Sequence, residues 1–253
     1  MLNLTTVGCN SNFILLPPVR LSIIIPLYNE PETVLTVLSA LQKIPLPSFV
    51  ESREIVVVDD CSTDSSLKNV EQYRAQHPEI VLLHHEKNMG KGRAVRTGIE
   101  KSTGDIILIQ DSDLELSPSD IPSMLNAMHE LNIEFVNGSR YLHGLVRPLA
   151  SYRRYIANKI FTFLTSVLIN VRLTDMACGY KLFSRSLYNR IKLEENRFGF
   201  EAELIIKALR DKRNNVAEVP VKYFPRNEGE GKKLKMSDGI KILWTIFKYG
   251  VLR

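Results

Sequence analysis

The sequence predicts an α/β fold built on a single, mainly parallel sheet that helices cover on both faces. Over the first half of the chain, short apolar runs rich in β-branched residues alternate with segments of helical periodicity. Each run is apolar at consecutive positions, which is typical of strands buried on both faces. Polar residues follow directly where several of the runs end. Because ligands bind outside the carboxyl ends of the strands in such sheets, we expect a binding site there.

Four strands and three helices are expected in the first half. The strands correspond to the apolar runs 21–27, 54–60, 80–85 and 105–111. The first helix follows Pro31, and its apolar residues recur at helical spacing from Val34 to Leu41. The second helix follows the polar segment after Asp60, and the third follows the glycine-bearing turn NMGKGR.

The second half mixes further helices with short strands. Helical periodicity covers 121–131, 152–171 and 201–210, and strand candidates lie at 134–139, 179–184 and 218–224. Pro220 within the last candidate strand predicts an edge position, because proline cannot donate to a neighbouring strand. We expect three regions along the chain: a flexible lead-in over 1–20, one folded domain over 21–233, and a basic amphipathic C-terminal helix over 234–253.

Composition and charge narrow the function classes. The 253 residues are 44% hydrophobic and 24% charged, enough for a sizeable core. The three scattered cysteines, Cys9, Cys61 and Cys178, predict neither a disulfide framework nor a zinc site and favour a reducing, cytoplasmic setting. The net charge of +5 divides into +6 over 140–172, +5 over 222–253 and −6 elsewhere. Two basic regions indicate anionic partners such as phosphorylated ligands or lipid head groups, although a solvated basic surface explains them equally well.

Acidic residues gather at the expected carboxyl edge of the sheet. They follow the first strand at Glu30, the second at Asp59 and Asp60, and the fourth at Asp111 and Asp113. Like charges placed together raise one another's pKa unless a cation or hydrogen-bond donors compensate. An alternating Asp-x-Asp pair at a strand end suits a hard divalent ion, which prefers oxygen ligands. The simpler interpretation of the second group is that Asp60, or Asp64 beyond it, caps the next helix.

Taken together, these segments resemble family 2 glycosyltransferases with the GT-A fold, and within them the dolichyl-phosphate mannose synthase-like and dolichyl-phosphate glucose synthase-like enzymes. The resemblance covers about Leu21 to Lys233 in the family's order. The segments that carry it are SIIIPLYNE, VVVDDCSTD, NMGKGRAVRTG, GDIILIQDSDLELSP, NGSRY, LTDMACGYKLF, FGFEAELIIKA and EVPVKYFPRNEGEGKK. It implies a metal-dependent, inverting transfer of a hexose from a nucleotide-sugar to a polyprenyl or dolichyl phosphate.

The resemblance also implies which residues bind the donor and the metal. Donor-binding positions of the family are matched by Pro26, Tyr28, Glu30, Asp60, Gly90, Lys91, Asp111 and Ser112. Asp60 matches the carboxylate that hydrogen-bonds the base. Asp111 and Asp113 match the pair that holds Mg²⁺ or Mn²⁺ against the donor diphosphate, with Asp113 also counted as catalytic. Glu115 falls where some relatives use glutamine as a further metal ligand, and its alternative is a solvated loop acid.

Basic residues of the second half match positions that the family places around phosphates. Arg140, Arg154 and Arg226 are the expected catalytic arginines, and Arg140, Arg154, Asn158 and Lys232 are the expected acceptor-binding residues. A phosphate monoester, whose second pKa is about 6, is already a nucleophile at neutral pH and needs no general base. No dedicated base stands out, although Glu201 or Glu203 could serve a hydroxyl acceptor.

The segment 152–171 has the profile of an interfacial helix. Its apolar residues share one face and accompany basic residues, with no acid in 140–172: they are Ile156, Ile160, Phe163, Leu164, Val167 and Leu168. A core helix gives the same periodicity, so that alternative stays open. No segment has the roughly 18 to 20 uninterrupted apolar residues that span a bilayer. We therefore expect a peripheral protein on the cytoplasmic face of a membrane, with or without an anchoring partner.

Two rival functions remain at this point. One is a family 2 glycosyltransferase that acts on a hydroxyl acceptor in polysaccharide or glycolipid assembly. The other is a non-catalytic binder of nucleotide-sugars or nucleic acid. We expect no nucleic acid as a partner, because clustered carboxylates repel phosphates unless a metal lies between them. The sequence does not distinguish a donor of the GDP-mannose type from one of the UDP-glucose type.

Overall fold

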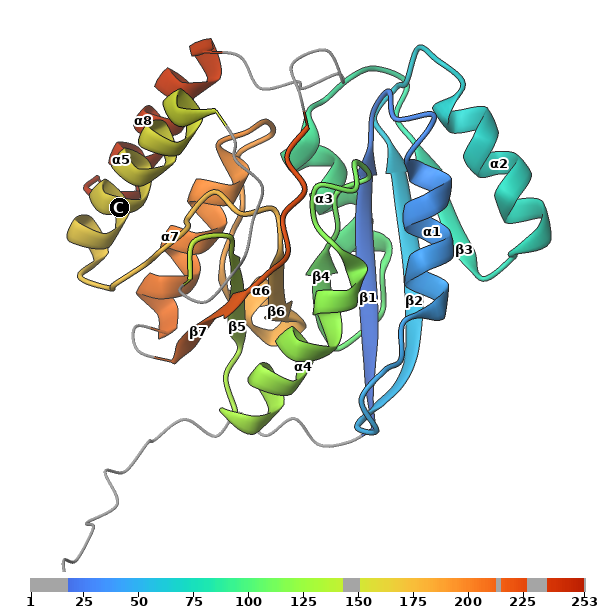
Figure 1. Cartoon of the computed structure of the whole chain (residues 1–253), viewed down its shortest axis with the longest axis horizontal. Helices are drawn as coiled ribbons and strands as arrows, with labels where there is room; N and C mark the ends of the chain where they lie inside the picture. Colours follow the sequence, from blue (N-terminus) through green and yellow to red (C-terminus); the bar gives the residue numbers. More distant parts are fainter. Residues whose placement is uncertain (1–17, 143–150, 213–214, 227–235, 253) are drawn as a thin grey trace, which may run out of the picture.

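A computed structural model describes residues 18–142, 151–212, 215–226 and 236–252. They contain one seven-stranded sheet in the order β3-β2-β1-β4-β6-β5-β7, with helices on both faces (Figure 1). The strands are β1 Val19–Leu27, β2 Val50–Asp59, β3 Ile80–His84, β4 Ile106–Ile109, β5 Phe135–Ser139, β6 Lys181–Ser184 and β7 Val216–Pro220. All neighbours are parallel except β6, which is antiparallel to β4 and β5. Six carboxyl ends therefore meet at one edge, as the sequence predicts.

Eight α-helices lie in the described parts of the chain. They are α1 Val34–Lys43, α2 Ser66–Gln76, α3 Lys91–Lys101, α4 Ile121–Glu130, α5 Tyr152–Ile169, α6 Arg185–Arg190, α7 Phe200–Lys212 and α8 Met236–Gly250. A single 3₁₀ turn, η1 Pro118–Asp120, precedes α4. The α/β class and the mainly parallel sheet are confirmed. The short helix α6 and the antiparallel direction of β6 were not predicted.

The core consists of two apolar layers, one on each face of the sheet. Successive residues of β1 enter opposite layers: Ile23 and Ile25 pack with α1 and α4, whereas Ile24 packs with α3 and α7. This alternation is the two-residue period of a strand. It explains why the central strands contain runs of consecutive apolar residues, such as Ile23 to Ile25 in β1 and Ile55 to Val58 in β2, because both faces are covered there.

The ends of the domain differ in detail from the expected regions. β1 begins at Val19, two residues before the expected domain start, and residues 1–17 lie outside the described residues. β7 is an edge strand that pairs only with β5, and Pro220 is its last residue, as predicted. α8 packs against α5 and α7 through buried Ile242, Ile246 and Tyr249. The C-terminal helix is therefore part of the same folded body.

Candidate active site

The segment after β4 carries the expected metal-binding pair at the carboxyl edge. Gln110 is fully buried; it accepts a hydrogen bond from Tyr180 Oη at 2.6 Å and donates from Nε2 to the carbonyl oxygen of Asp111 at 2.9 Å. The backbone then turns sharply, since Leu114 has a φ of 60°, a left-handed conformation that is costly for a branched side chain. These contacts anchor the start of the loop at Asp111, and Asp113 Oδ1 accepts from the backbone N–H of Glu115 at 3.0 Å within it.

The Asp111 carboxylate is paired and closely packed. Lys91 Nζ lies 2.7 Å from Asp111 Oδ1 and 2.7 Å from Glu201 Oε1, so one ammonium links the starts of α3 and α7 to the loop after β4. Burial lowers the pKa of Lys91, but the two carboxylates outweigh it and the net direction is upward. On its other side Asp111 faces Gly179, where a Cβ atom would overlap Asp111 Oδ2. A side chain at position 179 would therefore displace the Asp111 carboxylate.

The pKa of Asp113 is raised, because the positive charge near it does not offset burial and the neighbouring carboxylates. Burial, followed by the charges of Asp111 and Glu115, raises its pKa to about 7. Such oxygen-only groups fit a hard divalent cation. Within the described residues no three His, Cys, Asp or Glu side chains form a metal-binding group. A cation on Asp111 and Asp113 would thus take further ligands from phosphate or water. Glu115 Oε1 already accepts from the backbone N–H of Arg226 at 3.0 Å.

Asp60 organises the loop before α3. Its carboxylate accepts the backbone N–H groups of Met89 and Gly90 at 2.8 and 2.7 Å, and His85 Nδ1 lies 2.8 Å from Oδ1. Gly90 has a φ of 94°, and a Cβ there would come within 2.5 Å of the carbonyl oxygen of Asn196. This loop requires glycine for both reasons. Its contact with a nucleotide base stays a prediction, and the partner His85 was not foreseen. Asp64, in contrast, accepts from the backbone N–H of Ser66, the first residue of α2, although the N-cap position itself is Ser65 and not Asp60 or Asp64.

Arg226, which follows β7, forms an ion pair with Glu30, which follows β1. Its Nη1 and Nη2 donate to Glu30 Oε1 and Oε2 at 3.0 and 2.7 Å. The segment that leads from β7 to Arg226 runs across the sheet in Figure 1, and Phe224 N donates to the carbonyl oxygen of Glu115 at 2.9 Å. Thr33 adds a bridge, since its hydroxyl donates to the carbonyl oxygen of Ser112 at 2.6 Å. Glu30, Ser112 and Arg226 are therefore brought together as expected; Pro26 and Tyr28, on β1 and just after it, are half-buried beside them.

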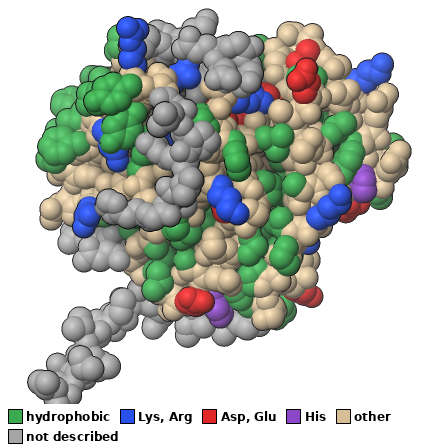
Figure 2. All heavy atoms as spheres, viewed as in Figure 1, with side chains coloured by type: hydrophobic (Ala, Val, Ile, Leu, Met, Phe, Trp, Pro, Cys, Tyr) green, Lys and Arg blue, Asp and Glu red, His purple; other side chains and the backbone are tan. Residues whose placement is uncertain are grey.

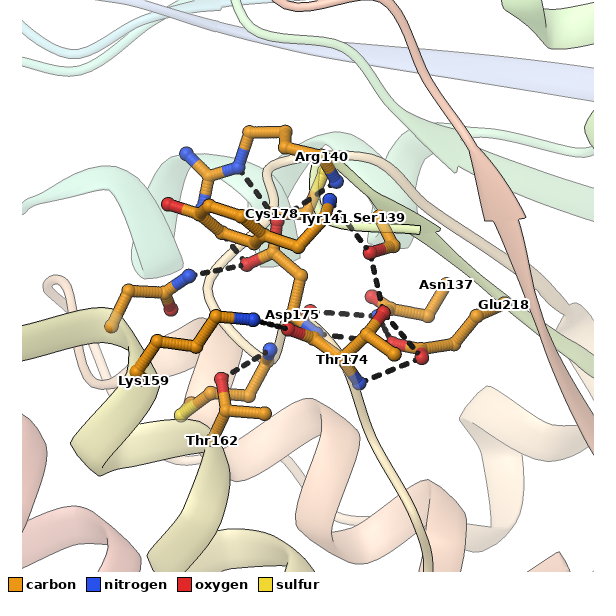
Figure 3. A network of polar contacts seen from close by, with 12 residues as sticks. Asn137, Ser139, Arg140, Tyr141, Lys159, Thr162, Thr174, Asp175, Cys178 and Glu218 are labelled. Carbon is orange, nitrogen blue, oxygen red and sulfur yellow. Dashed lines mark hydrogen bonds and ion pairs between the residues drawn. The ribbon is translucent and has the colours of Figure 1, made fainter. Parts of the chain in front are cut away.

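Arg140 follows β5 and is fixed by a residue that was not predicted. Its guanidinium donates from Nε and Nη2 to the two oxygens of fully buried Asp175, at 2.7 and 2.9 Å (Figure 3). Asn158, from α5, donates to the same carboxylate at 2.9 Å. Arg154 lies half-buried in the first turn of α5, and Lys232 falls outside the described residues. The acceptor contacts of these residues stay predictions.

Both candidate bases are already engaged. Glu203 is fully buried, and its carboxylate accepts the backbone N–H groups of Glu194 and Glu195 at 2.8 to 2.9 Å and pairs with Lys207 at 2.6 Å. Glu201 is held by Lys91. Glu203 therefore anchors the segment before α7, and Glu201 is a counter-ion rather than a free carboxylate.

Comparisons with known proteins agree with this architecture. The profile of glycosyl transferase family 2 matches residues 22–192. A dolichyl-phosphate beta-glucosyltransferase of Trichomonas vaginalis is 31% identical over 249 residues, which cover 93% of this chain and 74% of the relative. A dodecaprenyl-phosphate galacturonate synthase of Rhizobium johnstonii is 25% identical over 214 residues, which cover 84% of this chain and 61% of the relative.

A solved structure confirms the fold. Glucosyl-3-phosphoglycerate synthase from Mycobacterium tuberculosis, in complex with Mn²⁺, uridine diphosphate and phosphoglyceric acid, matches with a TM-score of 0.71 at 18% identity. The match covers 92% of this chain and 79% of that chain. The sheet is therefore that of the GT-A fold, as the sequence resemblance implies. With the family match over residues 22–192 and the 31% identity to a relative of which the match covers 74%, this chain is a glycosyltransferase that belongs to glycosyl transferase family 2, in the branch similar to dolichyl-phosphate glucose synthases.

Proposed function

We propose that this glycosyltransferase moves a hexose from a nucleotide-sugar to a polyprenyl or dolichyl phosphate, with inversion and with a bound divalent cation. The observation that carries the proposal is the contrast between the two sides of the site. Asp111 and Asp113 lie in the loop after β4, where we propose that the donor diphosphate binds, while Arg140 and Arg154 lie after β5 and in the first turn of α5, where we propose that the acceptor phosphate binds. The two relatives named above support the acceptor class, because their names refer to dolichyl and dodecaprenyl phosphate.

The existing contacts of Glu201 and Glu203, the two candidate bases, favour a phosphate acceptor over a hydroxyl acceptor. A hydroxyl must lose its proton during transfer, and a positioned base would have to take it. Glu203 is held by backbone amides, and Glu201 is paired with a lysine whose pKa is raised. A phosphate oxygen carries its own negative charge and can attack the sugar carbon directly. This chain then needs only to align the phosphate and the sugar.

Asp111 and Asp113 are the residues that would hold Mg²⁺ or Mn²⁺. The Mn²⁺ and uridine diphosphate in the Mycobacterium tuberculosis structure support this assignment. When bound, the cation would stabilise the negative charge that builds on the nucleoside diphosphate as it leaves. Lys91, 2.7 Å from Asp111, supplies a second positive charge at the same place.

The structure of α5 supports contact with a lipid surface. Its buried residues are polar, namely Asn158, Thr162 and Thr165, while Phe161, Leu164 and Ile169 pack partly buried against the core. Its outward face is apolar, and Phe163 and Val167 are 67% and 60% exposed. A core helix would have the opposite arrangement. Of the six apolar residues grouped from the sequence, Leu164 alone packs against the core cluster.

α8 extends this surface. It lies beside α5 and runs in the same direction, since Gly239 faces Phe161 and Gly250 faces Leu168 (Figure 1). Ile240 and Trp244 on α8 are 72% and 59% exposed. Figure 2 shows hydrophobic side chains gathered at this corner, with basic side chains beside them. We call the exposed apolar residues of the two helices the α5–α8 surface: Ile156, Ile160, Phe163, Val167, Leu168, Ile240, Leu243, Trp244 and Phe247.

We propose that the α5–α8 surface rests in the head-group layer of an anionic bilayer, at the cytoplasmic face. Arg153 and Lys241 are exposed on the two helices. Each basic residue near such a surface contributes about 1 kcal/mol of attraction, which salt weakens. No described helix is long and apolar enough to cross a membrane. The membrane contact is compatible with an additional membrane-anchoring partner, and co-purification from membranes would test for one.

The proposed reaction has a direct test. Purified protein is incubated with Mn²⁺ and either UDP-[¹⁴C]glucose or GDP-[¹⁴C]mannose, with polyprenyl phosphate in vesicles as acceptor. We expect label in the organic phase with one of the donors, released by mild acid as free sugar, because a sugar phosphodiester is acid-labile. Label that resists mild acid, or that enters only hydroxyl acceptors, would contradict the proposal and favour the hydroxyl-acceptor alternative.

The membrane contact predicts a chain-length effect. Replacing Phe163 and Trp244 with serine removes two large exposed side chains, each worth about 2 kcal/mol of apolar burial in lipid. We expect weaker co-sedimentation with anionic vesicles, and at least a tenfold loss of transfer to a long polyprenyl phosphate. Transfer to a short, water-soluble prenyl phosphate should change little. Leu131→Ser is the matched control, because Leu131 is 59% exposed just after α4. Equal loss with both acceptors would contradict the contact.

A further inference from the structure

A single buried carboxylate organises the acceptor side of the site. Asp175 lies in the segment between α5 and β6 and is fully buried. Its oxygens accept three N–H groups of Arg140, from N, Nε and Nη2 at 3.1, 2.7 and 2.9 Å. A fourth comes from Asn158 Nδ2 at 2.9 Å. We infer that Asp175 is a positioning residue that sets Arg140, at the end of β5, and Asn158, on α5, in the arrangement that aligns the acceptor phosphate with the donor sugar.

The contacts of Asp175 leave Arg140 little freedom. A guanidinium that gives two parallel hydrogen bonds to one carboxylate is fixed in orientation as well as in place. The rings of Tyr141 and Tyr223 flank it, with centroids 5.6 and 5.1 Å from its central carbon. Burial raises the pKa of Asp175, yet Arg140 lowers it further, so the carboxylate stays ionised. The Asp175 carboxylate thereby balances much of the positive charge of Arg140. We therefore expect Arg140 to act on the acceptor phosphate through the fixed orientation of its N–H groups more than through net electrostatic attraction.

Asp175 also determines how Asn158 is oriented. An ionised carboxylate only accepts hydrogen bonds, so the amide nitrogen of Asn158 must face it. Oδ1 of Asn158 then points away, and it is buried with no hydrogen-bond partner in the described residues. A buried amide oxygen without a partner is costly. The amide of Asn158 is therefore oriented by its contact with Asp175 and not by a described partner of its own oxygen.

The segment that carries Asp175 is itself anchored. Glu218, on β7, accepts hydrogen bonds from the backbone N–H and the hydroxyl of Thr174, both at 2.8 Å (Figure 3). Asn137, on β5, donates to the carbonyl oxygen of Asp175 at 2.8 Å. On the helix side, Met176 N donates to Thr162 Oγ1 at 3.2 Å. Asp175 is therefore the point where the sheet edge is tied to the helix that carries the proposed lipid-facing surface.

The inference rests on the proposed function and predicts a specific kinetic change. Asp175→Asn keeps the size of the side chain but replaces an acceptor with an amide N–H that opposes Arg140 or Asn158. A misplacement of about 1 Å at a reacting centre costs on the order of 100-fold. We expect transfer to polyprenyl phosphate to fall 30- to 100-fold at saturating acceptor. The nucleotide dissociation constant and the rate of donor hydrolysis by water should change less than about threefold.

The ratio of lipid transfer to donor hydrolysis is the main readout, because it does not depend on the fraction of folded enzyme. Glu134→Gln is the matched control: Glu134 is buried at the amino end of β5 and pairs with Arg190 at 2.7 Å, whereas Arg140 follows the carboxyl end of the same strand. It should lower stability and leave the ratio unchanged. Asn158→Ala, which leaves no buried charge unpaired, should lower the ratio 3- to 10-fold.

Three results would overturn the inference. One is a wild-type ratio in both Asp175→Asn and Asn158→Ala. Another is an equal fall in the ratio for Glu134→Gln. The third is a loss in the double variant Asp175→Asn/Arg140→Lys that equals the product of the two single losses, since residues acting through one another are not additive. Failure of the wild type itself to transfer to polyprenyl phosphate would instead overturn the proposed function, and the inference with it.

Discussion

The Asp113→Asn variant should lose transfer activity by at least about 100-fold while its fold becomes more stable in the presence of chelator. Asp113 is one of the two carboxylates that would hold the divalent cation, and the loss of one contact that stabilises the developing charge costs about 3 kcal/mol or more in activation free energy. Transfer is measured with the labelled donor and polyprenyl phosphate at saturating Mn²⁺. Undiminished transfer by this variant would exclude Asp113 as a cation ligand.

The gain in stability follows from the direction of the pKa shift. Folding raises the pKa of Asp113 from 3.8 to about 7, so the folded state binds this proton more tightly than the unfolded state does. The favourable contribution is complete below pH 3.8 and is lost as the pH rises through about 7. Above that pH the ionised carboxylate opposes folding, and the amide removes this penalty.

Thermal unfolding at two pH values tests whether Asp113→Asn raises or lowers the free energy of unfolding. At pH 8 in chelator we expect the Asp113→Asn variant to gain about 1 to 2 kcal/mol. This is less than the full pKa shift at about 1.4 kcal/mol per unit, because neighbouring groups relax. At pH 4.5 the gain should nearly vanish. A lower melting temperature than the wild type at pH 8 would show that Asp113 stabilises the fold in its ionised form.

Gly179→Ala should have the second-largest effect, although it adds one methyl group. The added Cβ would overlap Asp111 Oδ2, lie 3.2 Å from Asp111 Cγ and lie 3.3 Å from Leu116 Cδ1. Either the Asp111 carboxylate must move or the backbone of the rigid segment before β6 must shift. We expect kcat/KM for the donor to fall by about 30- to 300-fold, and the Mn²⁺ concentration for half-maximal rate to rise.

Gly239→Ala is the control for that substitution. Gly239 is within α8, and its added Cβ would meet only Phe161 Cζ, at the ordinary contact distance of 3.7 Å. The change should stabilise the helix by about 0.5 to 1 kcal/mol and leave kcat/KM unchanged. A Gly179→Ala enzyme with wild-type kcat/KM and Mn²⁺ dependence would show that Asp111 tolerates displacement.

The sequence predicts the fold well because the central strands are apolar on both faces. That pattern is visible locally in β1, β2 and β4, and it leaves few alternatives to a covered parallel sheet. The direction of β6 was missed because four consecutive buried residues give no information on strand polarity. The helix α6 was missed because six residues are too few to show a helical period.

The candidate site was only partly predictable. Carboxylates at strand ends are visible in the sequence, since strand ends are local features. The pairing of Arg140 with Asp175 joins residues 35 positions apart, and no local pattern indicates it. Similarly, the need for Gly179 arises only when β4 and β6 become neighbours.

The exposure of α5 illustrates a different limit. Periodicity identified its apolar face but not whether that face points into the protein or away from it. The polar residues on the opposite face, Asn158, Thr162 and Thr165, decide the matter only once their buried partners Asp175 and Met176 are known.

The ion pair of Glu30 with Arg226 has a consequence for folding during synthesis. It joins residues 196 positions apart, so the first turn of the site is completed only by nearly the last segment of the domain to leave the ribosome. Domains form as units during synthesis, and distant contacts are slow to close. The later helix α7 belongs to the core layer that covers one face of β1, β2 and β4, so we expect the sheet and this ion pair to form together. A chain that ends before Arg226 would lack both the completed core and the ion pair with Glu30.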